Sequence, residues 1–152
     1  MINTKQFEKE DIDKVIDFEK ELRRQEPNTY FWNIDEDYKT KVLNTFDDKN
    51  FDNALTFLAM DDNDVIGRID VSLIVSRCNG IIETAYLDWI CVLKSRRHEG
   101  VGQAMINHVK KYLKEKGISS FIVLTSENEE AKRYYDAMTK EASIMKALWF
   151  NL

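Results

Sequence analysis

The chain has 152 residues, 43% of them hydrophobic, so it suits a single domain (residues 1–152) with a sizeable core rather than a disordered segment. A net charge of −5 and an isoelectric point of about 5.1 argue against nucleic-acid binding and are compatible with a cationic small substrate. The start Met1–Gln6 is polar, no apolar run has membrane-spanning length, and the two cysteines lack metal spacing; we therefore expect a cytoplasmic protein without membrane or metal partners.

The first third of the chain predicts a short strand over 2–7 followed by two helices. Apolar residues recur at helical spacing from Ile12 to Leu22, and Pro27 ends this first helix. The second helix is expected over 35–49, and its acidic start is typical of a solvated helix end, although it could also face a polyamine. The aromatic turn 28–32 between them either folds onto the core or forms a wall of a substrate pocket.

Three strands are expected next, over 54–60, 65–75 and 81–93. The short polar turns between them predict antiparallel pairing. The third strand carries apolar residues on both faces, which predicts a central strand covered on both sides. Simple alternation divides its second half into two faces, Leu87, Trp89, Cys91 and Leu93 on one and Tyr86, Asp88, Ile90 and Val92 on the other.

Asp88 is a charge in the interior of this predicted strand. Burial would raise the pKa of its carboxyl group toward neutrality, as a general base requires. The alternative interpretation is a structural ion pair, for instance with Arg68. Glu83, nearer the strand start, is the second candidate base.

A basic turn with two glycines, Gly100 and Gly102, follows the third strand and precedes an amphipathic helix. Strand, glycine turn and helix start together form a phosphate cradle, because glycine lets backbone N–H groups approach an anion and a helix start adds unpaired donors. Arg96 and Arg97 add positive charge suited to phosphate oxygens. A Walker loop is excluded because no Gly-Lys-Ser/Thr closes the turn, and Met105 at the third position weakens a dinucleotide fingerprint.

The last third predicts a helix from Val101 that ends at Gly117 and a strand over 118–125 parallel to the central one. Ser126 and Glu129 form a capping box that opens another helix. The apolar residues of 142–152 predict one or two closing strands.

Two motifs resemble the GCN5-related N-acetyltransferase (GNAT) superfamily: Arg-x-x-Gly-x-Gly from Arg97 to Gly102, and Asn128-x-x-Ala131-x-x-Tyr134-Tyr135. The resemblance covers nearly the whole chain. It implies the GNAT fold, an α/β (α+β) arrangement with a central mixed, mostly antiparallel sheet of six to seven strands flanked by about four helices. It further implies acetyl-CoA as co-substrate, with direct acetyl transfer to a primary amine, and it allows a homodimer.

The resemblance also implies roles for individual residues. Asn128 would contact coenzyme A, and Tyr135 would protonate the leaving thiolate, with Tyr134 as the fallback. Asp88 occupies the position of the general base, and backbone N–H groups around Cys91 to Leu93 would meet the oxyanion. The residues expected to bind the coenzyme are Cys91, Val92, Leu93, Arg96, Arg97, His98, Glu99, Gly100, Val101, Gly102, Gln103, Asn128 and Tyr135.

Some alternatives stay open at this stage. Glu99 beside the first glycine could weaken pyrophosphate binding, and Met138-Thr139-Lys140 replaces the family's usual Gly-Phe before the closing strand. An acyl-enzyme on Cys91 is a rival to direct transfer. The acceptor is expected to be a polyamine-like or aminoglycoside-like amine; the rivals are a protein or peptide acetyltransferase and a non-catalytic acyl-CoA-binding regulator.

Overall fold

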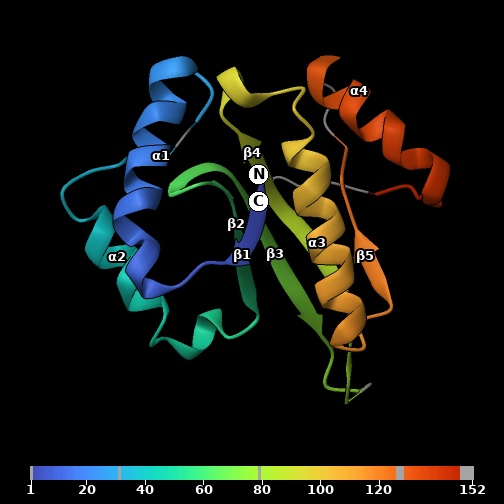
Figure 1. Cartoon of the computed structure of the whole chain (residues 1–152). Helices are drawn as coiled ribbons and strands as arrows, with labels where there is room; N and C mark the ends of the chain where they lie inside the picture. Colours follow the sequence, from blue (N-terminus) through green and yellow to red (C-terminus); the bar gives the residue numbers. More distant parts are fainter. Residues whose placement is uncertain (1, 31, 79, 126–128, 148–152) are drawn as a thin grey trace. The chain divides into compact units, whose positions relative to one another are not determined.

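The structure is a computed structural model that describes residues 2–30, 32–78, 80–125 and 129–147 (Figure 1). These residues belong to two compact units, Met1–Ile122 and Val123–Leu152. The elements of the first unit are β1 (Asn3–Gln6), α1 (Ile12–Gln25), α2 (Tyr38–Thr45), β2 (Ala54–Asp61), β3 (Asp64–Val75), β4 (Ile82–Val92), α3 (Val101–Glu115) and β5 (Ser120–Ile122). The second unit contains α4 (Glu129–Met138).

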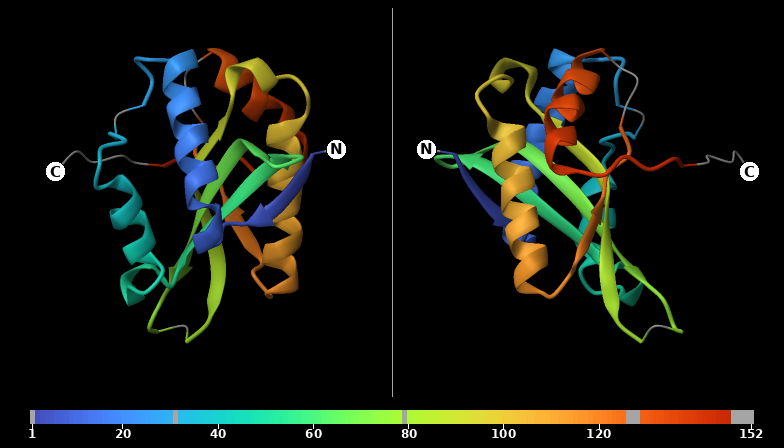
Figure 2. Two further views of the ribbon diagram at one scale, coloured as in Figure 1. Left: turned by 60° about the vertical axis from the view of Figure 1, so that its left-hand side comes forward. Right: turned by 90° about the vertical axis from the view of Figure 1, so that its right-hand side faces the viewer.

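The first unit is built on a five-stranded sheet with the strand order β1-β2-β3-β4-β5 (Figure 2). Each of β1 to β4 runs antiparallel to its neighbour, and β5 runs parallel to β4. The predicted antiparallel meander and the parallel return through a helix are therefore confirmed. Parallel pairing follows from α3, which carries the chain back so that β5 starts at the same end as β4.

Helices cover both faces of this sheet, with α1 on one face and α3 on the other (Figures 1 and 2). The core extends to both faces of the sheet: Phe57 and Met105 are fully buried on the α3 face, and Leu22 of α1 is fully buried on the other. Gly67 of β3 permits the close approach of α3, because a Cβ there would lie 3.0 Å from Met105 Cε and 3.2 Å from Val101 Cγ1. Sequence periodicity predicted both helices because their buried side chains recur every three to four residues.

Some sequence predictions were wrong in extent. The described residues contain five strands, not six to seven, and 143–147 form no strand. Ile144 and Met145 are 85% and 87% exposed there, so apolar composition alone does not provide a strand partner. The second helix is shorter than expected, and the predicted Ser126 capping box lies outside the described residues. No helix in the described ranges is long and apolar enough to cross a membrane.

Candidate active site

The glycine turn lies at the carboxyl end of β4, as the sequence predicted. Beyond β4, the chain forms a 3₁₀ turn (Lys94–Arg96) and reaches Gly100, whose φ of 81° lies in the left-handed region. This conformation favours glycine because it lacks a Cβ. α3 then begins at Val101.

The amino terminus of α3 is open to an anion. Gly100 is the N-cap residue of α3 and has no side chain with which to cap the helix, and the first turn of α3 has no acidic residue. Helix geometry leaves the N–H groups of Val101, Gly102 and Gln103 without intrahelical acceptors, and Ala104 N donates to Gly100 O at 2.9 Å. Such donors at the positive end of a 15-residue helix are chemically suited to a phosphate group.

The two arginines of the turn are held by carboxylates. Arg96 pairs with Asp61 at 2.8 Å and with Glu99 at 2.9 Å, so the negative charge of Glu99 is compensated where it adjoins the first glycine. Arg97 pairs with Glu26 at the end of α1. In this structure the backbone donors, rather than the guanidinium groups, are therefore the groups available to an anion.

β4 separates from β5 before it reaches the glycine turn. Among the described residues, β5 pairs with β4 only from Thr84 to Tyr86. On the other side, Val92 is opposite Gly67 of β3, and the next N–H, that of Leu93, donates to Ile66 O at 3.0 Å. This pattern makes Val92 a non-hydrogen-bonded partner of β3, so its N–H points toward the edge that β5 leaves unpaired. Of the expected oxyanion donors, Leu93 N–H is therefore already engaged and Val92 N–H is directed outward.

Asp88 lies at a β-bulge, and the expectation that it is buried was wrong. Asp70 is opposite Trp89 while Val71 is opposite Leu87, so Asp88 is the extra residue of β4. Its side chain is exposed and accepts a hydrogen bond from Ser72 Oγ at 2.5 Å. The bulge breaks the simple alternation that the sequence prediction assumed. The alternative interpretation, an ion pair between Asp88 and Arg68, does not hold either, because Arg68 pairs with Glu19 and Asp70 instead.

The pKa of Asp88 is raised despite this exposure. Partial desolvation by the surrounding protein is the main cause, and the negative charge of Asp70 adds to it, whereas the hydrogen bond from Ser72 opposes it. A carboxylate with a raised pKa is a better proton acceptor at neutral pH than an ordinary aspartate. Asp88 is therefore still a candidate base, because partial desolvation and the charge of Asp70, rather than full burial, raise its pKa.

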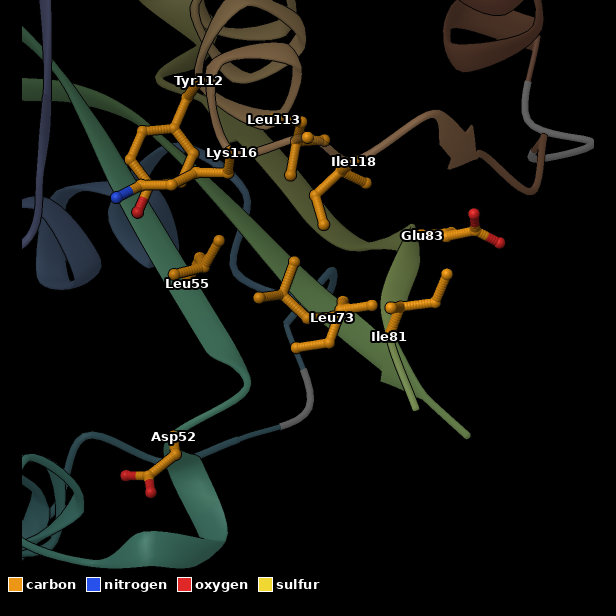
Figure 3. A pocket seen from close by; sticks show the side chains of 11 residues that line it. Asp52, Leu55, Leu73, Ile81, Glu83, Tyr112, Leu113, Lys116 and Ile118 are labelled. Atoms are coloured by element: carbon orange, nitrogen blue, oxygen red, sulfur yellow. The ribbon is translucent and has the colours of Figure 1, made fainter. Parts of the chain in front are cut away.

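Glu83, the second candidate base, lies at the other end of β4 (Figure 3). It lines an apolar cleft together with Ile81, Lys116 and Ile118. Val92 lies nine positions further along the strand, which corresponds to roughly 30 Å at the usual rise per residue. The structure therefore does not bring Glu83 together with the glycine turn.

Cys91 is buried and poorly suited to act as a nucleophile. Burial raises the pKa of its thiol to about 12, and the Sγ donates to Arg68 O at 3.8 Å. The thiolate is the reactive form of cysteine, and it is scarcely populated at neutral pH under these conditions. This environment disfavours the acyl-enzyme route.

Three aromatic residues, Tyr30, Trp32 and Trp89, form a cluster that we call the aromatic cluster, and Trp89 directly follows Asp88 in β4. The Trp32 and Trp89 rings meet edge-on with centroids 5.2 Å apart, and Tyr30 lies 5.6 Å from Trp32 and 6.3 Å from Trp89. The sequence indicates the aromatic turn that carries Tyr30 and Trp32, but it does not indicate the contact of this turn with Trp89. No sequence signal links residues so far apart in the chain.

In the second unit, α4 carries the tyrosines of the second motif. The Tyr134 and Tyr135 rings pack edge-on with centroids 5.4 Å apart, and burial raises the pKa of Tyr134. Asn128 lies outside the described residues. The role of Tyr135 as a general acid stays a prediction.

A family model described as the acetyltransferase (GNAT) family matches residues 8–138. The chain belongs to the GNAT family. The match includes the glycine turn, Asp88 and α4, and it makes the protein a GNAT-type N-acetyltransferase. Members of this family use acetyl-CoA, which agrees with an open helix start at the end of β4.

Solved structures share the fold of this GNAT protein at low sequence identity. An aminoglycoside acetyltransferase from an uncultured soil metagenomic sample, in complex with sisomicin, has a TM-score of 0.79 and 15% identity over 99% of this chain and 95% of its own. AAC(6')-Iy in complex with the bisubstrate analogue CoA-S-monomethyl-acetylneamine has a TM-score of 0.71 and 19% identity, covering 100% and 98%. Ribosomal-protein-alanine N-acetyltransferase from Brucella melitensis biovar Abortus 2308 has a TM-score of 0.71 and 13% identity, covering 100% and 99%. No curated protein sequence matches the chain.

Proposed function

We propose that this GNAT protein binds acetyl-CoA at the β4–α3 turn and transfers its acetyl group directly to a primary amine of a small molecule. The observation that carries the proposal is the start of α3 at left-handed Gly100, beyond the end of β4 that β5 leaves unpaired. The N–H groups of Val101, Gly102 and Gln103 bind the diphosphate of the coenzyme. Both units belong to one acetyltransferase domain, because the family match runs across their boundary.

The proposed reaction begins with deprotonation of the amine. A free alkyl ammonium has a pKa of about 10.4, so it carries no nucleophilic lone pair at neutral pH until a base removes the proton. Asp88 accepts that proton, directly or through water. The amine nitrogen then attacks the thioester carbonyl, and the Val92 N–H stabilises the oxyanion. Collapse of the intermediate forms the amide and breaks the carbon–sulfur bond. Tyr135 protonates the leaving thiolate, and the second proton released by the attacking nitrogen restores the Tyr135 hydroxyl through solvent.

The acceptor is a polyamine-like or aminoglycoside-like amine. The net charge of −5 favours a cationic substrate, and the exposed carboxylate of Asp88 offers it a counter-charge. Two similar structures hold sisomicin and an acetylneamine analogue, which supports this class of acceptor.

Thiol release from acetyl-CoA tests the function across polyamines, aminoglycosides, other small amines and lysine- or alanine-terminated peptides. We expect turnover with at least one polyamine or aminoglycoside and little with the peptides. Transfer only to peptides would contradict the small-molecule acceptor. Binding of acetyl-CoA without thiol release to any amine would support a non-catalytic regulator instead.

Tyr135→Phe should lower kcat by roughly 10²–10⁴-fold, the usual contribution of a general acid, with little change in acetyl-CoA affinity. The variant keeps the ring and loses only the proton donor. Tyr134→Phe is the matched control, since it removes the adjacent hydroxyl from the same helix. Steady-state kinetics with both variants decides between them, and full activity of Tyr135→Phe would remove this residue from the mechanism.

A further inference from the structure

The mechanism leaves unexplained a fully buried carboxylate on α1. Glu19 has a side-chain exposure of 0%. Its carboxylate accepts hydrogen bonds from Arg23 Nη1 at 2.5 Å, from Arg68 Nη1, and from Trp32 Nε1 at 3.2 Å. These donors belong to α1, to β3 and to the segment between α1 and α2, so one carboxylate joins three separate parts of the fold.

A buried ion-pair cluster of this kind contributes little to the stability of the fold. Burying charges costs desolvation energy, and the attraction between the charges often only offsets that cost. A buried ion pair is therefore weak evidence for stabilisation. What the charges do provide is direction, because a guanidinium group and an indole N–H bond only in defined orientations. A role in positioning therefore accounts for Glu19 better than a role in stability.

Trp32 is the group whose position depends on this cluster. Its indole N–H is bound by Glu19, and its carbonyl oxygen accepts a hydrogen bond from Arg23 Nη2 at 2.8 Å. The guanidinium carbons of Arg23 and Arg68 lie 5.1 Å and 5.4 Å from the ring centroid. Both the ring and the backbone of Trp32 are thus held by groups that Glu19 pairs.

The ring that Glu19 holds in turn contacts the strand of the candidate base. Trp32 packs edge-on against Trp89 at 5.2 Å with an interplanar angle of 84°, and Trp89 directly follows Asp88 in the bulge. Arg68 extends the same cluster to Asp70 at 3.0 Å, and Asp70 is the register partner of Trp89. Displacement of Trp32 would therefore alter the wall beside Asp88 while leaving the glycine turn intact.

We propose that Glu19 is a positioning residue for the amine acceptor: through Arg23 and Arg68 it fixes Trp32 against Trp89 and so shapes the acceptor side of the site. This inference rests on the proposed acetyl transfer for its kinetic part. Its structural part, the fixed Trp32–Trp89 pair, does not depend on any activity.

Near-ultraviolet circular dichroism tests the structural part. The electronic transitions of two indoles held this close at a steep angle couple and give a pair of dichroism bands of opposite sign. Trp32→Phe should abolish these bands, which identifies them as the signal of the Trp32–Trp89 pair. We expect Glu19→Gln to lose most of that signal. Asp13→Asn is the control: it removes an exposed charge, paired with Lys39, from the same helix, and it should keep the signal. An unchanged signal in Glu19→Gln would overturn the proposal.

Steady-state kinetics tests the kinetic part. We expect Glu19→Gln and Trp32→Phe to raise the KM for the amine by roughly ten- to a hundredfold, as displaced site groups do, with the KM for acetyl-CoA changed less than about twofold. A comparable rise in both KM values, or a lower Tm with both constants unchanged, would make Glu19 merely structural and overturn the proposal. Trp32→Phe keeps the test decisive if Glu19→Gln does not fold, because it leaves the Glu19 ion pairs in place. Absence of thiol release by the wild-type protein would refute the proposed function, and the dichroism would still test the Trp32–Trp89 pair.

Discussion

Replacing Gly100 by valine is expected to weaken acetyl-CoA binding by about a hundredfold or more while the protein stays folded. A valine disfavours the φ of 81° that Gly100 adopts, since a left-handed conformation costs an L-residue about 1–2 kcal/mol. The loop then turns its N–H donors away from the diphosphate, and each lost bond to a charged group costs about 1.5–3 kcal/mol. Isothermal titration calorimetry measures the affinity directly.

Gly117→Val is the matched control for this variant. Gly117 has a φ of 78°, close to that of Gly100, and at neither position would a Cβ meet another atom within 4 Å. The two substitutions therefore impose similar backbone strain at opposite ends of α3. Both should lower Tm by a similar amount, but only Gly100→Val should lose the coenzyme. Equal affinities in the two variants would show that the α3 start does not bind the diphosphate.

Asp88→Asn is expected to lower kcat/KM by roughly 10²–10⁴-fold near neutral pH, the contribution of a general base. The wild-type rate should rise with pH as Asp88 ionises, and because its pKa is raised this rise occurs at a higher pH than for an ordinary aspartate. The variant should instead recover as the amine loses its own proton toward a pKa of about 10.4. The deficit is therefore largest at low pH, and a pH–rate profile of both proteins measures it.

Stability provides the internal check on Asp88→Asn. A carboxyl group whose pKa is raised by folding contributes stability below its unfolded pKa, and this contribution is lost as pH rises through the folded value. At neutral pH the ionised Asp88 therefore contributes no such stability, and the variant should unfold at the same temperature or slightly higher. Glu83→Gln on the same strand should retain full activity; a loss there with an active Asp88→Asn would transfer the role of base to Glu83.

The sequence predicted the strand–turn–helix unit well because its determinants are local. The apolar run before Val92, the glycines after it and the helical spacing from Val101 all lie within one short segment. The closing strands over 142–152 failed in the described residues for the complementary reason. Apolar composition favours burial, but a strand forms only where another strand supplies hydrogen-bond partners.

The bulge at Asp88 shows a second limit. Alternation along one strand predicts its faces only if the register against its neighbour is constant, and the register of β4 shifts between Asp70 and Val71 of β3. No residue type within β4 indicates this register shift. The predicted environment of Asp88 was therefore wrong even though the strand itself was placed correctly.

Long-range ion pairs were equally invisible in the sequence. The sequence predicts Arg97 as a phosphate ligand, whereas in the fold it pairs with Glu26, 71 residues away. In the sequence, Glu19 is a polar residue at an otherwise apolar helical spacing. In the fold it pairs with Arg68, 49 residues away. Side-chain charge is visible in a sequence, but its partner is determined by the tertiary fold.

The most direct test of the central claim is a calorimetric titration of the wild-type protein with acetyl-CoA and with S-acetyl-pantetheine, which lacks the diphosphate and the adenosine 3′-phosphate attached to it. We expect saturable binding of acetyl-CoA and an affinity for S-acetyl-pantetheine lower by at least about a hundredfold, since bonds to charged groups contribute about 1.5–3 kcal/mol each. Equal affinity for the two ligands, or no binding of acetyl-CoA, would contradict it.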